Sequence, residues 1–238
     1  MDIKLPISIL PQPDDTTCGP TCLHAVYNYY GDTVPLADVI ADTRMLDAGG
    51  TLAVFLACSA LRRGYLSTIY TYNLQMFDPS WFSATDVNIA ERLRLQAASK
   101  TDRKLQNATS GYLEFLVLGG KLRFTDLNTR LLRSIIRRRL PILTGLSSTY
   151  LYRTQREFGP DDEPDDIRGQ PAGHFVILSG YHRQDRTVLV ADPLSPNPVA
   201  PTQLYPVNID RAICAILLGV LTYDANLLVI HPRRIRMT

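Results

Sequence analysis

Cys18 begins an apolar helical stretch that runs to Tyr30, and Gln12 lies six residues before it. The N-terminus of a helix presents unpaired N–H groups and a partial positive charge, which favour a thiolate over a thiol. Cysteine pKa values at such positions fall from about 8.5 to between about 3.5 and 7.5. The placement therefore predicts that Cys18 is a nucleophile.

A base for this thiol is expected from a predicted β-hairpin. His174 opens the strand-like run 173–182, which is followed by a polar turn and a returning strand over 187–192. In an antiparallel pair with this turn, His174 and Asp192 fall at the same end. Asp192 could then accept the second N–H of the imidazole and hold its tautomer. We expect His174 to be the general base and Asp192 to orient it.

Gln12 completes the set of candidate catalytic residues. Its amide would join the backbone N–H of Cys18 in an oxyanion hole, where the loss of one donor costs about 10²–10³ in rate. His174 would take the thiol proton and later give it to the leaving group. The order Gln12, Cys18, His174, Asp192 resembles that of papain-like thiol enzymes.

The sequence resembles one family more closely: the papain-like peptidases that trim double-glycine leaders from bacteriocin precursors, with their stand-alone, mostly bacterial relatives. The matching segments, in order, are Gln12–Gly31, Gly49–Thr51, Pro141–Leu143, Gly173–Asp192 and Leu227–Ile230. Thr17 stands where many relatives carry an aspartate. The membrane and ATPase domains of the transporter-linked members have no counterpart, so leader processing during export is not implied.

The resemblance implies an α+β papain-like fold. A helical half would carry Cys18, an antiparallel sheet half would carry His174 and Asp192, and the substrate cleft would lie between them. We expect residues 1–238 to form a single domain, with an inserted helical segment at 74–128. The acidic, proline-containing loop 153–172 should be mobile and should act as a flap over the site.

Local patterns predict the elements that position these residues. Gly31 and Gly64 are expected to end two helices. The expected strands are Ile3–Leu10, Tyr65–Tyr72 and Pro141–Gly145, and the expected helices are Leu36–Leu46, Leu52–Arg63, one or a pair within Asp86–Leu105, and Asn128–Arg139.

The composition of the chain indicates the kind of protein and its location in the cell. The 238-residue chain is 45% hydrophobic and 20% charged, which is ordinary globular usage. No apolar run approaches the roughly 20 residues that span a bilayer, and no signal peptide is evident, so a cytoplasmic protein without membrane contact is expected. A net charge of +2 gives no strong attraction for nucleic acid. The arginines at 137–139 and 233–236 are interpreted as a solvated helix end and tail.

The remaining thiols and imidazoles offer weaker alternatives. Cys22 is expected to pack one helical turn after Cys18, and Cys58 and Cys214 to be buried in the core. Four dispersed cysteines suggest reduced thiols, and their spacing does not match a metal site. No cofactor is implied. His182 could replace His174 as the base, but it lies next to the predicted turn.

These observations favour a thiol-dependent peptidase or amide hydrolase that forms an S-acyl intermediate on Cys18, with a peptide or amide as its substrate. The same intermediate could be intercepted by an amine, so a cysteine acyltransferase is one alternative. A peptide-binding module that keeps the fold without catalysis is another. The sequence leaves the substrate and the oligomeric state open.

Overall fold

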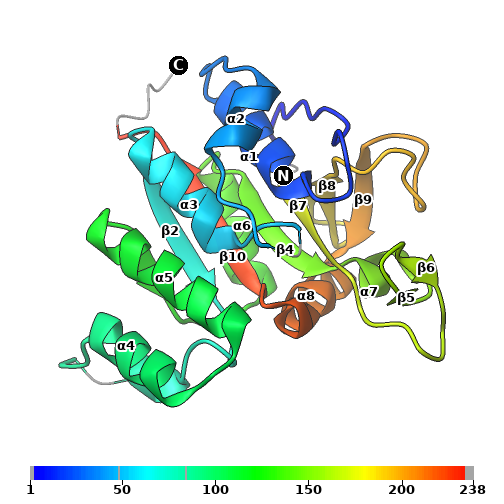
Figure 1. Ribbon diagram of the computed structural model, residues 1–238. Helices are drawn as coiled ribbons and strands as arrows, with labels where there is room; N and C mark the ends of the chain where they lie inside the picture. The colour runs from blue at the N-terminus through cyan, green and yellow to red at the C-terminus, as the bar shows by residue number, and fades with distance from the viewer. Residues whose placement is uncertain (1–2, 48, 84, 234–238) are drawn as a thin grey trace.

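The structure is a computed structural model that describes residues 3–47, 49–83 and 85–233 (Figure 1). Residues 234–236 of the arginine-rich tail lie outside the described residues. The elements in chain order are β1 (Ile3–Lys4), α1 (Cys18–Tyr29), α2 (Leu36–Asp42), α3 (Ala53–Arg62), β2 (Leu66–Thr71), η1 (Pro79–Phe82), α4 (Ile89–Ser99), α5 (Arg103–Val117), β3 (Lys121–Arg123), α6 (Thr129–Arg137), β4 (Ile142–Ser147), α7 (Ser148–Tyr152), β5 (Glu157–Phe158), β6 (Glu163–Pro164), β7 (Gly173–His182), β8 (Thr187–Ala191), β9 (Leu204–Asn208), α8 (Ile209–Leu218), η2 (Gly219–Thr222) and β10 (Asn226–His231).

An eight-stranded sheet forms the centre of the molecule. Its strands follow the order β3-β2-β10-β4-β7-β8-β9, and β1 pairs with the end of β7 on the edge that also pairs with β4, opposite β8. All pairs are antiparallel except β2 with β3. β7 is flanked by β4 and β8 and is buried along nearly its whole length, which explains why its sequence is an almost unbroken apolar run.

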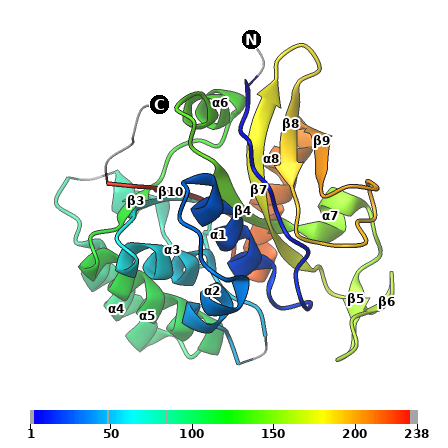
Figure 2. The same ribbon diagram turned by 90° about the horizontal axis from the view of Figure 1, so that it is seen from above.

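Helices cover both faces of this sheet. Phe175 and Ile177 of β7 belong to a buried cluster with residues of α1, α3 and α5, whereas Val176 and Leu178 pack with residues of α6 and α8. Figure 2 shows α3 and α5 on the opposite side of the strands from α6. The alternation of side chains along a strand therefore places β7 between two apolar layers.

The first helix is bounded as its sequence predicts. α1 begins at Cys18, and Gly31 follows its end with a φ of +79°, a left-handed conformation that glycine adopts without the strain of a Cβ atom. Gly64 has a φ of +94° just after α3. These two glycines follow α1 and α3, whose buried side chains belong to the apolar cluster on this face of the sheet.

Other predictions are confirmed with shifted bounds. The first strand is reduced to β1, because Pro6 has no N–H to donate to a ladder. The second helix ends at Asp42 rather than at Leu46. A helical pair, α4 and α5, is found within 74–128, and α5 continues to Val117. Leu93 and Phe115 of this pair share the buried cluster that contains α1.

The expectation that Cys214 lies in the core is wrong. Cys214 is exposed, although its neighbours Ala215 and Ile216 on α8 are buried. The helix is amphipathic, and position 214 falls on the face that points away from the sheet. Cys58 on α3 is buried, as expected.

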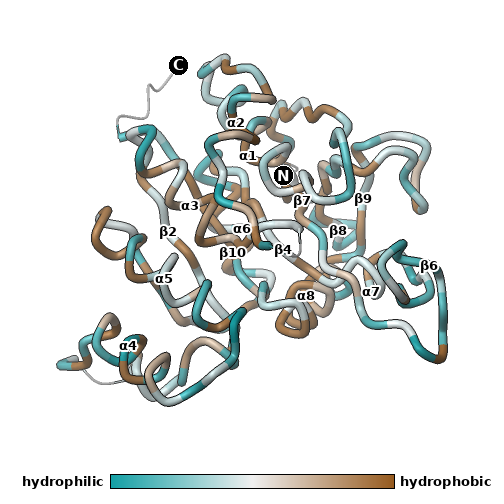
Figure 3. The backbone as a smooth tube through the Cα atoms, in the orientation of Figure 1, coloured by the Kyte–Doolittle hydropathy of each residue, from teal (hydrophilic) through white to brown (hydrophobic). Residues whose placement is uncertain are grey.

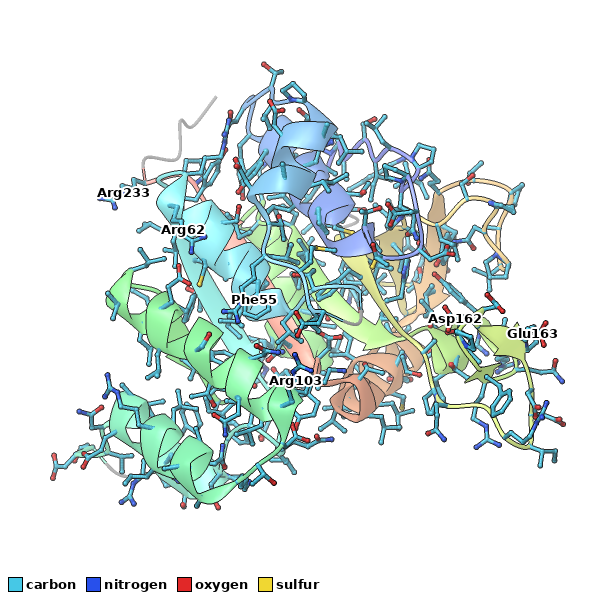
Figure 4. The ribbon with its side chains drawn as sticks, viewed as in Figure 1. Phe55, Arg62, Arg103, Asp162, Glu163 and Arg233 are labelled. Carbon is cyan, nitrogen blue, oxygen red and sulfur yellow. The ribbon has the colours of Figure 1, made fainter. Side chains whose placement is uncertain are left out.

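Part of the acidic segment 153–172 is a short hairpin. β5 pairs with β6, and the backbone of Glu157 also exchanges hydrogen bonds with Gln170 at 3.0 and 2.7 Å. The hairpin is hydrophilic (Figure 3), and Asp162 and Glu163 mark its place beside α7 in Figure 4. At its base, the backbone N–H and the hydroxyl of Ser148 both donate to the carbonyl of Ala172. These bonds join the end of the segment to the start of α7. Among the described residues, no helix is long and apolar enough to cross a membrane.

Candidate active site

α1 places the Cys18 thiol at the first residue of a helix. The preceding residue, Thr17, does not cap the helix with its side chain, since its hydroxyl donates to the carbonyl of Asp14 at 3.1 Å. The first turn contains no acidic residue. Its backbone N–H groups therefore lack the usual side-chain acceptor, and the helix dipole favours a negative charge at this end. Cys18 is 8% exposed, so this charge would be largely shielded from water.

His174 is the second residue of β7, opposite Leu146 of β4. The residue is buried, at 7% exposed. The ring Nε2 lies 2.8 Å from Oδ1 of Asp192, so this nitrogen is hydrogen-bonded to the carboxylate. Nδ1 is the ring nitrogen that remains for the thiol. Such a division of the two nitrogens is what a base with a separate orienting acid requires.

The pKa of His174 depends on its two neighbours, Cys18 and Asp192. Burial by itself lowers the pKa of the imidazole, because a cation loses its hydration. The charge of Cys18 and the hydrogen bond to Asp192 outweigh burial and raise the pKa of His174 to about 10. His174 is therefore an imidazolium at neutral pH when Cys18 carries a negative charge.

Asp192 follows β8 directly and is fully buried, at 0% exposed. Its carboxylate accepts hydrogen bonds from groups on several elements: Nε2 of His174 (2.8 Å), the backbone N–H of Leu194 (3.0 Å), Nδ2 of Asn197 (3.0 Å) and the hydroxyls of Tyr152 (2.7 Å) and Tyr205 (2.5 Å). Burial raises the pKa of Asp192, but the bond and charge of His174 and the other donors reverse this effect and hold its pKa below the ordinary value. The acid is thus a stable buried anion.

Gln12 lies in the loop between β1 and α1. Its backbone N–H donates to the carbonyl of Pro193 at 2.9 Å, which places it beside the residue that follows Asp192. The side-chain Nε2 donates to the carbonyl of Asp14 at 2.9 Å. An amide nitrogen carries two hydrogens, so one N–H is not used by this bond. Oε1 is buried and has no hydrogen-bond partner among the described residues.

The structure brings Cys18, His174 and Asp192 together, with Gln12 on the adjoining loop. The alternative base, His182, lies at the opposite end of β7, where Nδ1 is 2.9 Å from Oδ2 of Asp185 in the turn. Cys22 is fully buried. Among the described residues, no group of three or more His, Cys, Asp or Glu side chains could hold a metal ion.

Three residues around Asp192 were not anticipated from the sequence: Tyr152 on α7, Tyr205 on β9 and Asn197 in the loop between β8 and β9. The alternation of β9 could have indicated that Tyr205 points inward, since Tyr205 and Val207 are buried and Pro206 and Asn208 are exposed. No local signal marks Tyr152, because its partner is 40 residues further along the chain.

Glu157 brings a carboxylate from the hairpin to the vicinity of the site. Glu157 is exposed, but a partial loss of hydration around its carboxylate raises its pKa, the charges of Asp162 and Asp15 raise it further, and the charge of His174 lowers it. Glu157 is thus within electrostatic reach of both His174 and the loop that precedes α1.

A cavity of about 360 Å³ lies elsewhere, lined by Tyr27 and Arg63 among others, and includes none of the four candidate catalytic residues.

The chain is similar to proteins of known family and known structure. A family model described as the Peptidase_C39 like family matches residues 4–208. A search of curated proteins finds no match to the chain. A crystal structure from Bacillus anthracis, described as a C39-like peptidase, aligns with a TM-score of 0.52 and 12% identity over 98% of both chains. This likeness indicates a shared fold and confirms the expected α+β papain-like architecture.

Two further solved structures have lower scores. Xylellain, a cysteine protease from Xylella fastidiosa, aligns with a TM-score of 0.49 and 14% identity over 98% of this chain and 86% of its own. A double-glycine-motif protease from an AMS/PCAT transporter, crystallised with the leader peptide, aligns with a TM-score of 0.44 and 13% identity, over 96% of this chain and 94% of its own.

Proposed function

The chain belongs to the Peptidase_C39 like family, and we propose on this premise that it is a cysteine peptidase in which Cys18 is the nucleophile and His174 the general base. The observation that carries the proposal is the 2.8 Å contact of His174 with the buried Asp192, beside a cysteine at a helix N-terminus. Asp192 orients the imidazole, and Gln12 contributes to the oxyanion hole.

In the proposed acylation step, Sγ of Cys18 attacks the carbonyl carbon of a peptide or amide bond. The S–C bond forms as the C–N bond breaks, and the imidazolium of His174 gives its proton to the leaving amine. The backbone N–H of Cys18 and the free side-chain N–H of Gln12 are the proposed donors to the oxyanion. The product of this step is a thioester on Cys18.

In the proposed deacylation step, His174 accepts a proton from water as the water oxygen attacks the thioester. The C–S bond breaks, and the free acid leaves with Cys18 and His174 restored as an ion pair. Asp192 remains ionised throughout, because its role is to hold the imidazole rather than to take the proton.

An acyltransferase would use the same first step and an amine in place of water. A peptide-binding module would use neither step. The buried ionised pair of His174 and Asp192 favours catalysis over simple binding, since a pair of buried charges stabilises a fold less than apolar packing would. We further propose a cytoplasmic location, which is supported by the four cysteines, all of them free thiols.

The experiment that tests the proposal is incubation of the protein with a complex peptide mixture, followed by mass spectrometry of newly formed termini. Cleavage should be lost in Cys18→Ser, which keeps a hydroxyl in place of the thiol. A parallel incubation with glycinamide would reveal acyl transfer as glycinamide-capped products. Peptides that are retained without cleavage by the parent and by Cys18→Ser would instead indicate a binding module.

A further inference from the structure

The two oxygens of Asp192 have different partners. Oδ1 accepts from His174 and from the backbone N–H of Leu194, whereas Oδ2 accepts from the hydroxyls of Tyr152 and Tyr205 and from Nδ2 of Asn197. One oxygen thus serves the imidazole, and the other is surrounded by donors from α7, β9 and the loop between β8 and β9. The carboxylate cannot rotate without breaking bonds on both oxygens.

We propose that the hydroxyls of Tyr152 and Tyr205 are positioning groups of the active site, which keep Asp192 ionised and its Oδ1 directed at His174. The catalytic role assigned to this arrangement rests on the proposed function. The charge and orientation of Asp192 do not, because both are measurable without a substrate. Neither tyrosine contacts a reacting atom in this scheme, so both act through Asp192.

The charge of Asp192 depends on these donors. Burial of the carboxylate favours its neutral form, and hydrogen bonds to the charged form favour the anion. A hydrogen bond to a charged group contributes about 1.5–3 kcal/mol, which corresponds to about 1–2 pH units. The removal of one phenolic hydroxyl should therefore raise the pH at which Asp192 takes up a proton.

The aromatic ring of Tyr152 also lies near that of His174, with the centroids 6.1 Å apart and the planes inclined by 55°. Tyr152 is the last residue of α7, and the acidic segment begins at the next residue. Tyr205 is 5% exposed and approaches Asp192 from β9. The two tyrosines thus hold the carboxylate from two separate elements.

The other titratable groups that face Asp192 change their charge at higher pH than Asp192 does. They are His174 from β7, Tyr152 from α7, Tyr205 from β9 and Cys22 from α1. The pKa of His174 is raised to about 10, and burial raises the pKa values of both tyrosines and of Cys22 above their ordinary values. Of this group, Asp192 alone should titrate in acid.

The experiment is an NMR titration of the full chain labelled with ¹³Cγ-aspartate, extended from pH 7 down to about pH 1.5 because the pKa of Asp192 lies below its ordinary value. Asp192→Asn identifies the signal of Asp192. We expect its midpoint to rise by about one pH unit in Tyr152→Phe and in Tyr205→Phe, and by more in the double variant. Thermal unfolding at pH 7 establishes that each variant is folded. Should the double variant not fold, the two single variants carry the test.

Tyr30→Phe is the matched control. Its hydroxyl donates to the backbone carbonyl of Ile230 at 2.8 Å, so this variant loses a similar hydrogen bond that does not involve a carboxylate. The midpoint of Asp192 should not move in Tyr30→Phe. An unmoved midpoint in both single variants, or an equal movement in Tyr30→Phe, would overturn the proposal. Failure of the proposed function would instead be seen as an absence of Cys18-dependent cleavage, whatever the titration shows.

Discussion

The thiol of Cys22 donates a hydrogen bond to the backbone carbonyl of Phe175 at 3.3 Å. Cys22 lies one helical turn after Cys18, and Phe175 follows His174 directly. The bond therefore joins the helix of the proposed nucleophile to the strand of the proposed base. Burial raises the pKa of Cys22 well above its ordinary value, and the charges of Cys18 and Asp192 add to this effect. Cys22 is thus a structural link and a poor nucleophile.

We expect Cys22→Ala to destabilise the protein by about 1–2 kcal/mol, because a buried sulfur and a hydrogen bond are lost. The free energy of unfolding from urea denaturation measures this loss. Cys22→Ser is the control, since its hydroxyl retains a donor for the carbonyl of Phe175. In the native parent, iodoacetamide should leave Cys22 unmodified. Modification of Cys22 as fast as that of the exposed Cys214 would contradict its assignment as a buried link.

Alkylation of Cys18 should depend on His174. The raised pKa of the imidazole keeps His174 protonated up to about pH 10, and an imidazolium stabilises a neighbouring thiolate. We expect His174→Ala to reduce the iodoacetamide rate at Cys18 by at least tenfold at pH 6 and to change it little at pH 10. Peptide-resolved mass spectrometry gives the rates, with Cys214 in the same molecule as an internal reference. Equal rates in parent and variant at pH 6 would exclude the ion pair.

Gln12→Ala should separate catalysis from thiol reactivity. An oxyanion-hole donor acts on the tetrahedral species and not on the free thiol, so we expect kcat to fall by about 10²–10³ with little change in the alkylation rate of Cys18. A peptide identified by its Cys18-dependent cleavage is the substrate for this measurement. A parallel fall in alkylation would show that Gln12 supports the fold of the loop instead.

Asp224 makes stability depend on pH in the opposite sense to Asp192. It is 4% exposed, and a Cβ atom on Gly145 would lie 2.5 Å from its Cγ, so the carboxylate packs directly on β4. Burial raises the pKa of Asp224 to about 7, against smaller opposing effects of Lys104 and Thr222. The folded state therefore binds this proton more tightly than the unfolded state, and stability falls as the pH rises from about 4 to 7.

Asp224→Asn should remove this dependence, since an amide does not ionise. We expect the variant to be more stable than the parent at pH 8.5, by up to ~4 kcal/mol, and similar to it at pH 4. Thermal unfolding at the two pH values measures the difference. Asp86→Asn, at an exposed position, is the control and should show no gain in stability at pH 8.5 relative to pH 4. A gain that is equal at both pH values would show that Asp224 does not titrate in this range.

Much of the site could be predicted because its signals are local. A helix that starts at Cys18 and ends before Gly31 follows from apolar spacing and from a glycine that tolerates a positive φ. The hairpin of β7 and β8 follows from two apolar runs around a polar turn, and its geometry brings His174 and Asp192 to one end. These features depend on residues that are close in the chain.

Tertiary structure decided the surroundings of Asp192 and Asp224. Tyr152 and Tyr205 come from separate elements, and only the docking of α7 and β9 against the end of β8 brings their hydroxyls to one oxygen. Asp224 occupies the space above Gly145 because β10 pairs with β4 in a particular register. Likewise, the exposure of Cys214 depends on which face of α8 meets the sheet. Local sequence patterns determine periodicity and turns, whereas the register and packing of distant segments arise from the combined burial of side chains across the whole core.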